Sequence, residues 1–130
     1  FEPEVSAIAC RRATDEEISG ILELGKEVER TIEAGKDRTV IDQEFHNAIV
    51  DASHNSFLKQ LIPIINRAVE EAILFDSGTG TLVENTLRDH ALLMEFLKNR
   101  DAGGAKRAMY VHLHHAIATL RLNSGEEPIF

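Results

Sequence analysis

Aromatic residues, cysteine and long apolar runs are all scarce in this sequence, and each scarcity excludes something. The 130 residues include no Trp and only 5% aromatic residues, so the core has to be built from aliphatic side chains and a few Phe. The single cysteine, Cys10, excludes an internal disulfide, fits a reducing cytoplasm and is expected to be a small buried apolar group. No apolar run approaches the roughly 20 residues that span a bilayer and no signal peptide is visible, so we expect no membrane association.

Positive charge is also in deficit. Asp and Glu outnumber Lys and Arg by 22 to 14, which gives a net charge of -8. A field of this sign repels phosphate groups, so the chain is a poor candidate to bind nucleic acid or an anionic membrane surface by itself. The hydrophobic fraction of 43% is enough for the core of one ordinary domain. Because the chain opens with Phe1 rather than Met, we interpret it as part of a longer protein whose upstream portion is missing.

Strand patterns are absent as well, because alternation of period two never lasts, whereas a period of 3.6 residues recurs throughout. The positions of helix-capping and helix-breaking residues predict six helices, at about 2–12, 14–34, 39–53, 56–75, 82–99 and 102–122. Thr14 and Glu17 form a capping box, Asn55 is a candidate N-cap, and Pro63 predicts a kink. Short connections between long helices predict an all-α, antiparallel bundle over residues 1–122, followed by a frayed polar tail, 123–130.

Four residues with metal-binding side chains stand on the apolar faces of three predicted helices. Asp42 and His46 are one helical turn apart, His90 stands between Leu87 and Met94, and His112 lies beside Met109. An imidazole or carboxylate in such a place loses its water and must find a partner. Packed together, the three helices could bring these groups to one point, and the donor set suits zinc, nickel, iron(II) or manganese(II).

Other interpretations of these side chains remain open. A histidine on an apolar face is often a core residue hydrogen-bonded to a neighbour, and Asp42 and His46 could be an ordinary i, i+4 pair. His115 lies three residues after His112, partly on the same face. It could be the ligand instead, or it could contact a ligand without binding the metal itself. We expect His114 to face solvent and His54 to have a capping or surface role.

The motifs around these histidines resemble the FCD domain of GntR-superfamily (FadR-like) regulators. Asp42-Gln43-Glu44-Phe45-His46 resembles the D-x-x-F-H element, and 52–55 resembles the small-residue turn, ending in Asn, that follows it. Residues 88–90 and 96–102 resemble the stretch with the second histidine, although Arg100 stands where Gly is usual. Residues 105–113 resemble the A-R-x-A-M-x-x-H-L element, and 1–4 and 12–17 resemble the first two helices. The resemblance covers nearly the whole chain except the tail.

This resemblance implies a ligand-sensing and dimerisation domain of a bacterial transcription regulator, not an enzyme. A divalent metal, zinc before nickel, iron or manganese, would be held by Asp42, His46, His90 and His112. A small carboxylate or hydroxycarboxylate effector would bind beside it. The whole protein would be a cytoplasmic homodimer that reaches operator DNA through a winged-helix domain ahead of Phe1.

The resemblance gives less guidance on the effector pocket. In the family, an Arg usually precedes the L-E-P-E-like segment that residues 1–4 resemble. The corresponding position falls upstream of Phe1. Asn55 and Arg88 are lesser candidates to line the pocket. The alternatives are that Asn55 caps a helix and that Arg88 pairs with Glu84 on the surface.

Two other functions compete with the sensor. A metal-dependent hydrolase could use the same ligands to activate water, but it needs a general base near the metal. Glu44 points away from the face of Asp42 and His46, and Asp89 is the best remaining candidate. A purely structural dimerisation bundle would use the same residues as hydrogen-bonded core groups.

Overall fold

Helices account for nearly all of the part of the chain that the computed structural model describes, which comprises residues 2–62, 64, 67 and 80–124. Five helices are delimited, and residues 56–62 are also helical. The delimited helices are α1 (Glu2–Arg12), α2 (Asp15–Glu33), α3 (Thr39–Ala52), α5 (Gly80–Lys98) and α6 (Ala102–Ser124). No strand occurs within these ranges, so the predicted all-α class is confirmed.

The helix bounds lie close to the predicted ones. α1 begins and ends as predicted, and α2, α3 and α5 differ from prediction by one or two residues at an end. α6 continues through Ser124, so the first two residues of the expected tail are helical. Residues 125–130 lie outside the described residues, as do Pro63 with its predicted kink and most of the second half of the predicted fourth helix.

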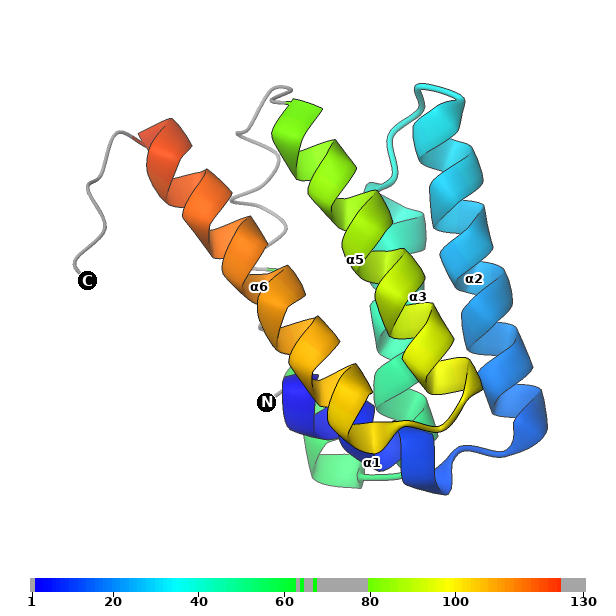
Figure 1. The fold of residues 1–130 in the computed structure, drawn as a ribbon. Helices are drawn as coiled ribbons and strands as arrows, with labels where there is room; N and C mark the ends of the chain where they lie inside the picture. Colours follow the sequence, from blue (N-terminus) through cyan, green and yellow to red (C-terminus); the bar gives the residue numbers. More distant parts are fainter. Residues whose placement is uncertain (1, 63, 65–66, 68–79, 125–130) are drawn as a thin grey trace.

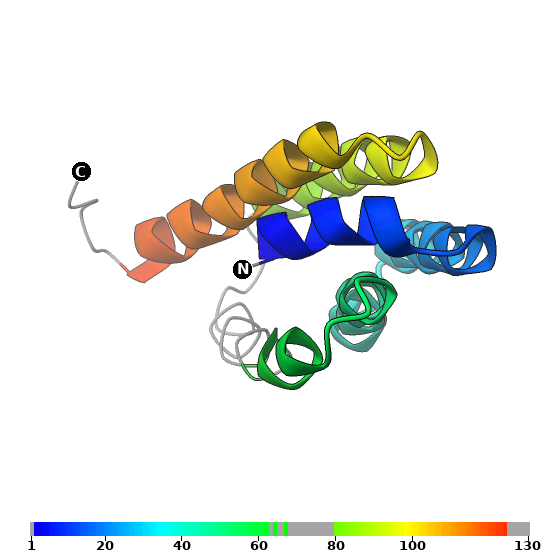
Figure 2. The ribbon, with the colours of Figure 1, turned by 90° about the horizontal axis from the view of Figure 1, so that it is seen from below.

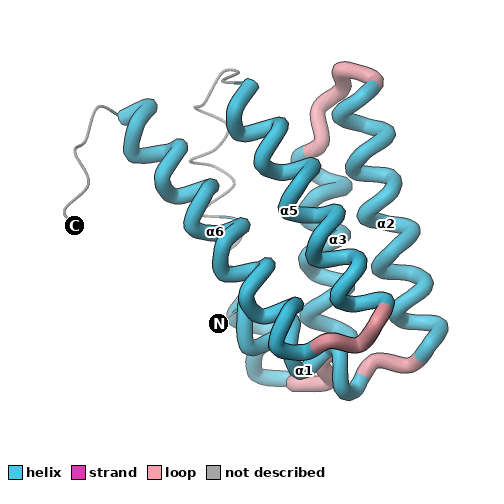
Figure 3. Tube along the Cα trace, viewed as in Figure 1, coloured by secondary structure: helices cyan, strands magenta, loops and turns pink. Residues whose placement is uncertain are grey.

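The helices form a bundle in which α1 is the exception in direction. α2 and α3 run in opposite directions, as do α5 and α6, while α1 crosses the bundle at one end (Figure 1). Seen from below, α1 lies between the α5–α6 pair and the layer of α3 and residues 56–62 (Figure 2). The described connections are short (Figure 3), which agrees with the predicted antiparallel arrangement. α1 therefore contacts α3, α5 and α6 together.

The core is aliphatic, as the scarcity of aromatic residues requires. Each large side chain that is fully buried contributes about 1.5–3 kcal/mol to folding. The largest of these side chains are those of Phe45, Ile21, Ile49, Ile62, Leu93, Leu97 and Met109. Gly25 brings α2 close to α3 and α5, because a Cβ at this position would collide with Met94 Sδ and lie 3.0 Å from Cε1 of Phe45. None of the described helices is both long and apolar enough to cross a membrane.

The buried face of α5 differs from the simple apolar stripe of its sequence. On α5, Leu87 is only half-buried, whereas the neighbouring Thr86, Asp89 and Leu93 are buried. Cys10 is buried as expected, with 1% of its surface exposed. The inward face of α5 is therefore more polar than its sequence pattern indicates.

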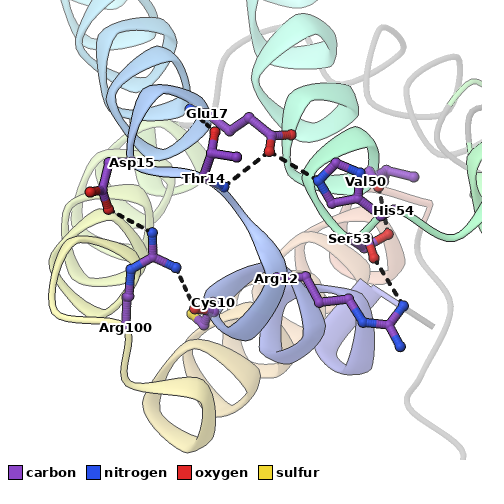
Figure 4. Close-up of polar contacts among 9 residues, drawn as sticks. All are labelled: Cys10, Arg12, Thr14, Asp15, Glu17, Val50, Ser53, His54 and Arg100. Atoms are coloured by element: carbon purple, nitrogen blue, oxygen red, sulfur yellow. Dashed lines mark hydrogen bonds and ion pairs between the residues drawn. The ribbon is translucent and has the colours of Figure 1, made fainter.

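The corner between α1 and α2 is held by side-chain hydrogen bonds (Figure 4). Arg100 follows α5 with a left-handed φ of 54°, the conformation for which the resembled pattern uses Gly. Its guanidinium donates to the carbonyl of Cys10 at 3.1 Å and to Asp15 at 2.9 Å. These two bonds tie the end of α5 to the α1–α2 corner, which a glycine could not do.

Candidate metal centre

Three histidines from three helices meet inside the bundle. His46 from α3, His90 from α5 and His112 from α6 are all buried, and one ring nitrogen from each lies within 4.8 Å of the others. Each stands among core side chains of its own helix, such as Phe45 beside His46 and Met109 one turn before His112. Because those neighbours pack into the core, the imidazoles are directed inward with them.

Asp42 lies against two members of this triad. Its Oδ1 is 3.5 Å from Nε2 of His46 and 3.4 Å from Nε2 of His90. The Nε2 atoms of His90 and His112 are 3.3 Å apart. The structure therefore brings together the three histidines predicted as ligands, with the predicted carboxylate beside two of them.

These separations are compatible with a metal ion, and the hydrogen bonds among the described residues leave one inward atom unpaired. Asp42 Oδ1 is buried and has no hydrogen-bond partner among the described residues, although two imidazoles face it. Tetrahedral ligands at the usual zinc distances are about 3.3 Å from one another. The Nε2 atoms of His90 and His112 and the contacts of Asp42 Oδ1 with His46 and His90 have about this spacing, at 3.3–3.5 Å, so the inward atoms could surround a cation.

The outer nitrogens of two imidazoles face carboxylates. Glu2 Oε1 lies 3.2 Å from Nδ1 of His46, and Asp89 Oδ2 lies 3.2 Å from Nδ1 of His112. Histidines that bind metals commonly donate the other ring N–H to a carboxylate, which fixes the tautomer and the ring orientation. Nδ1 of His90 is buried and has no such partner among the described residues.

Charges around the centre oppose the effect of burial on the ionisation of His46 and Asp42. Burial lowers the pKa of His46, but Glu2 and Asp42 more than compensate and raise it to about 10. Burial raises the pKa of Asp42, and the facing imidazoles of His46 and His90 overcome this and hold it well below its usual range. Burial dominates for His90 and keeps its pKa well below the usual value, so the ring is neutral. Asp42 and His90 are thus in the forms that bind metals, an ionised carboxylate and a neutral imidazole, whereas His46 would have to release a proton when a metal binds.

The ring of Phe45 forms an apolar wall of the centre. Its centroid is 4.7 Å from that of His90 and 5.5 Å from that of His46. The side chain of Asp42 is 26% exposed, whereas that of His90 is 1% exposed. Among the four residues, Asp42 therefore offers the most direct contact with solvent.

The other predicted candidates lie away from the centre. His115 is half-buried and bonds through Nδ1 to Asp89 at 2.8 Å, so it shares the carboxylate behind His112. His54 is exposed and lies 3.0 Å from Glu17, in agreement with a surface role, and His114 is exposed. Asn55 accepts a hydrogen bond from the N–H of Leu58, which supports its reading as a helix cap.

Three residues near the centre were not assigned their observed positions from the sequence. The sequence pattern does not indicate Glu2, and it indicates Asp89 only as a candidate general base. Because Asp89 is bonded to the outer nitrogens of His112 and His115, the hydrolase hypothesis loses its best base. Arg38 is half-buried one turn before Asp42, and its positive charge lowers the pKa of both Asp42 and His90. Arg88 is exposed, two residues from His90 and thus on another side of α5.

Comparison with known proteins places this geometry in context. The family model described as the FCD domain matches residues 1–115. A bacterial relative, the HTH-type transcriptional regulator YdhC of Bacillus subtilis (strain 168), is 29% identical over 120 residues. That match covers 88% of this chain but 54% of the relative, so the chain spans about half of its length.

Two solved structures have the same fold. GntR of Streptococcus agalactiae superposes with a TM-score of 0.80 at 21% identity, over 92% of this chain and 54% of that protein. McbR/YncC of E. coli superposes with a TM-score of 0.81 at 21% identity, over 95% of this chain and 60% of that protein. At this level of identity the two structures establish a shared architecture.

Proposed function

Because this chain belongs to the FCD domain family, we propose that it is the ligand-sensing and dimerisation domain of a bacterial transcription regulator. It binds a divalent metal and a small organic acid, and it acts in the cytoplasm as a homodimer. The Bacillus subtilis relative bears the name of an HTH-type transcriptional regulator, and the match covers 54% of its length. The remainder of the protein contacts operator DNA, in line with the net charge of -8 on this part.

The metal is held by Asp42, His46, His90 and His112. One observation carries this assignment: three buried imidazoles bring ring nitrogens within 4.8 Å of one another beside a buried carboxylate oxygen that lacks a hydrogen bond. Zinc suits neutral imidazoles with one carboxylate, and nickel, iron(II) and manganese(II) are the alternatives. When bound, the ion supplies a positive anchor for an oxygen atom of the acid.

The metal assignment is tested by measuring metal content by mass spectrometry after purification. We expect about one divalent ion per chain in the wild type, and loss of that ion in His90→Ala. His114→Ala is the matched control, because it removes an exposed histidine two residues from His112 on the same helix. A wild-type chain that binds none of the four ions, or a His90→Ala variant that retains its ion, contradicts the assignment.

The acid enters beside Asp42, where the centre is closest to solvent. Arg38 is the N-cap residue of α3, one turn before Asp42, whose N–H donates to the Arg38 carbonyl at 2.8 Å, and no ion pair involves Arg38 among the described residues. Its guanidinium adds a second positive charge next to the metal, and arginine binds carboxylates through two parallel hydrogen bonds. We assign to Arg38 the contact with the carboxylate of the acid. The pocket roles of Asn55 and Arg88 stay predictions.

Arg38 gives a test of acid binding that is independent of the metal. In the zinc-loaded chain, Arg38→Gln should weaken binding of citrate or L-lactate by about 10-fold or more, because it removes a charge-assisted hydrogen bond. Titration calorimetry measures this loss. Lys36→Gln removes a nearby exposed cation and should change little. Equal affinities in wild type and Arg38→Gln would exclude the assigned contact, and unchanged zinc content would show that the metal site is intact.

Regulation follows from linkage between the acid and the dimer. An effector shifts the protein between two arrangements only by its difference in affinity for them. The acid therefore changes operator binding if it prefers one dimer geometry over the other.

A further inference from the structure

Glu2 is a buried carboxylate on a helix that contributes none of the proposed metal ligands. It is the first residue of α1, it is 7% exposed, and its Oε1 lies 3.2 Å from Nδ1 of His46. Glu4, also in the first turn of α1, is exposed and lies 3.7 Å from Lys106. A carboxylate that only stabilised the N-terminus of a helix could remain exposed to water, as that of Glu4 does. Burying a carboxylate is costly unless it is paired. The burial of Glu2 therefore points to its partner.

We propose that Glu2 is a positioning residue that holds His46 in its metal-binding orientation and so couples α1 to the occupancy of the metal centre. Glu2 accepts the hydrogen of Nδ1, which leaves the lone pair of His46 on Nε2, the atom that faces Asp42. This inference rests on the proposed metal binding. It assigns to α1 a role in transmitting the presence or absence of the metal to other parts of the protein.

Asp89 provides an internal comparison. It makes the same type of contact with His112, but it belongs to α5, which already carries His90. Asp89 also bonds His115, so its position does not depend on His112 alone. Glu2, by contrast, brings in a helix that crosses the bundle and contacts α3, α5 and α6 (Figure 2). Among the contacts described, Glu2 joins α1 to a proposed ligand.

The experiment compares Glu2→Leu, Glu2→Gln and the control Glu4→Gln in the 130-residue chain. Zinc affinity is measured by competition with a chelator, and the ligand geometry is followed through the visible spectrum of the cobalt(II)-loaded protein. Glu2→Leu should weaken zinc binding by about 10- to 100-fold and alter the cobalt spectrum. Glu2→Gln keeps an oxygen acceptor and should recover part of the affinity. Glu4→Gln should match the wild type.

Hydrogen exchange tests the coupling to α1. In the wild type, zinc should slow exchange of the α1 amides together with those of α3, α5 and α6. In zinc-saturated Glu2→Leu, α1 should gain much less protection than the other three helices. If Glu2→Leu does not fold, Glu2→Gln carries the test, with a several-fold loss of zinc affinity expected at an unchanged metal-free melting temperature.

The outcomes separate the two proposals. If Glu2→Leu binds zinc as tightly as the wild type, the role of Glu2 is overturned and the proposed metal site remains. The same holds for Glu2→Gln when it is the only variant that folds. Full protection of α1 in zinc-loaded Glu2→Leu overturns the coupling. A wild-type chain that binds no zinc overturns the metal site and, with it, the role of Glu2.

Discussion

The two ring nitrogens of His46 and of His112 have different surroundings. Nε2 of His46, His90 and His112 faces inward, and the outer nitrogens of His46 and His112 face carboxylates. A carboxylate behind an imidazole fixes which nitrogen carries the proton and makes the other a better donor to a metal. A substitution of the carboxylate that faces an outer ring nitrogen can therefore alter metal binding although the ligands themselves are unchanged.

Cys10 provides a prediction about a single buried group. Its Sγ lies 3.8 Å from the carbonyl oxygen of Asp101, and burial, assisted by the negative charge of Asp101, raises the pKa of the thiol to about 11. The pKa in the unfolded chain is about 8.5, so the buried neutral thiol stabilises the fold below that pH, and this stability is lost as pH rises toward 11.

Urea unfolding at pH 7 and pH 10 measures this effect. The wild type should lose on the order of 1–2 kcal/mol more unfolding free energy between the two pH values than Cys10→Ala does. The native thiol should also react far more slowly with a disulfide reagent at pH 8 than the urea-unfolded one. An equal loss in both proteins, or rapid labelling of the native chain, would contradict the buried position.

Single residues differed in how far the sequence could predict them. The four inner residues were identified because each stands on an apolar helix face, where a polar group needs a partner. Glu2 could not be found in this way, since its contact with His46 joins residues 44 positions apart and leaves no local pattern. Arg38 is not part of a helical periodic pattern either, because it is the N-cap residue that precedes α3.

At the scale of elements, the start of α2 is determined by a reciprocal pair of hydrogen bonds. The N–H of Glu17 donates to Thr14 Oγ1 at 3.1 Å, and the N–H of Thr14 donates to Glu17 Oε1 at 3.0 Å (Figure 4). The same carboxylate oxygen lies 3.0 Å from Nε2 of His54, just after α3. This capping box therefore also links the start of α2 to the end of α3.

Replacing Thr14 tests the cap. Thr14→Ala should reduce the unfolding free energy by about 1 kcal/mol, because it leaves the N–H of Glu17 without its partner. Thr14→Ser keeps the hydroxyl and should lose much less. Denaturant unfolding with the metal removed isolates this effect, and equal stability of Thr14→Ala and the wild type would show that the cap contributes nothing.

Helix limits were predictable because they depend on local chemistry, such as the capping box at Thr14 and the left-handed Gly35 after α2. The buried face of each helix was less predictable, since it depends on which neighbours cover it. Thr86 and Asp89 are polar yet buried, because α5 packs between other helices and Asp89 meets the histidines of α6. Partners of this kind come from tertiary packing.

At the scale of the whole molecule, the proposed metal joins helices from both halves of the chain. α3 supplies Asp42 and His46, while α5 and α6 supply one histidine each, and Glu2 adds α1 behind them. Because the site forms only when these helices pack, the free energy of metal binding adds to that of folding. The bundle and the sensor would thus be stabilised by the same ion.

Anomalous scattering at the zinc absorption edge, from crystals grown with zinc, tests the central claim most directly. We expect one strong peak inside the bundle, about 2.0–2.2 Å from Nε2 of His46, His90 and His112 and from an oxygen of Asp42. Crystals of His90→Ala grown in the same way should lack that peak. A wild-type map without a peak among the three histidines, or with peaks only at surface residues, would show that they are packing groups and not a metal centre.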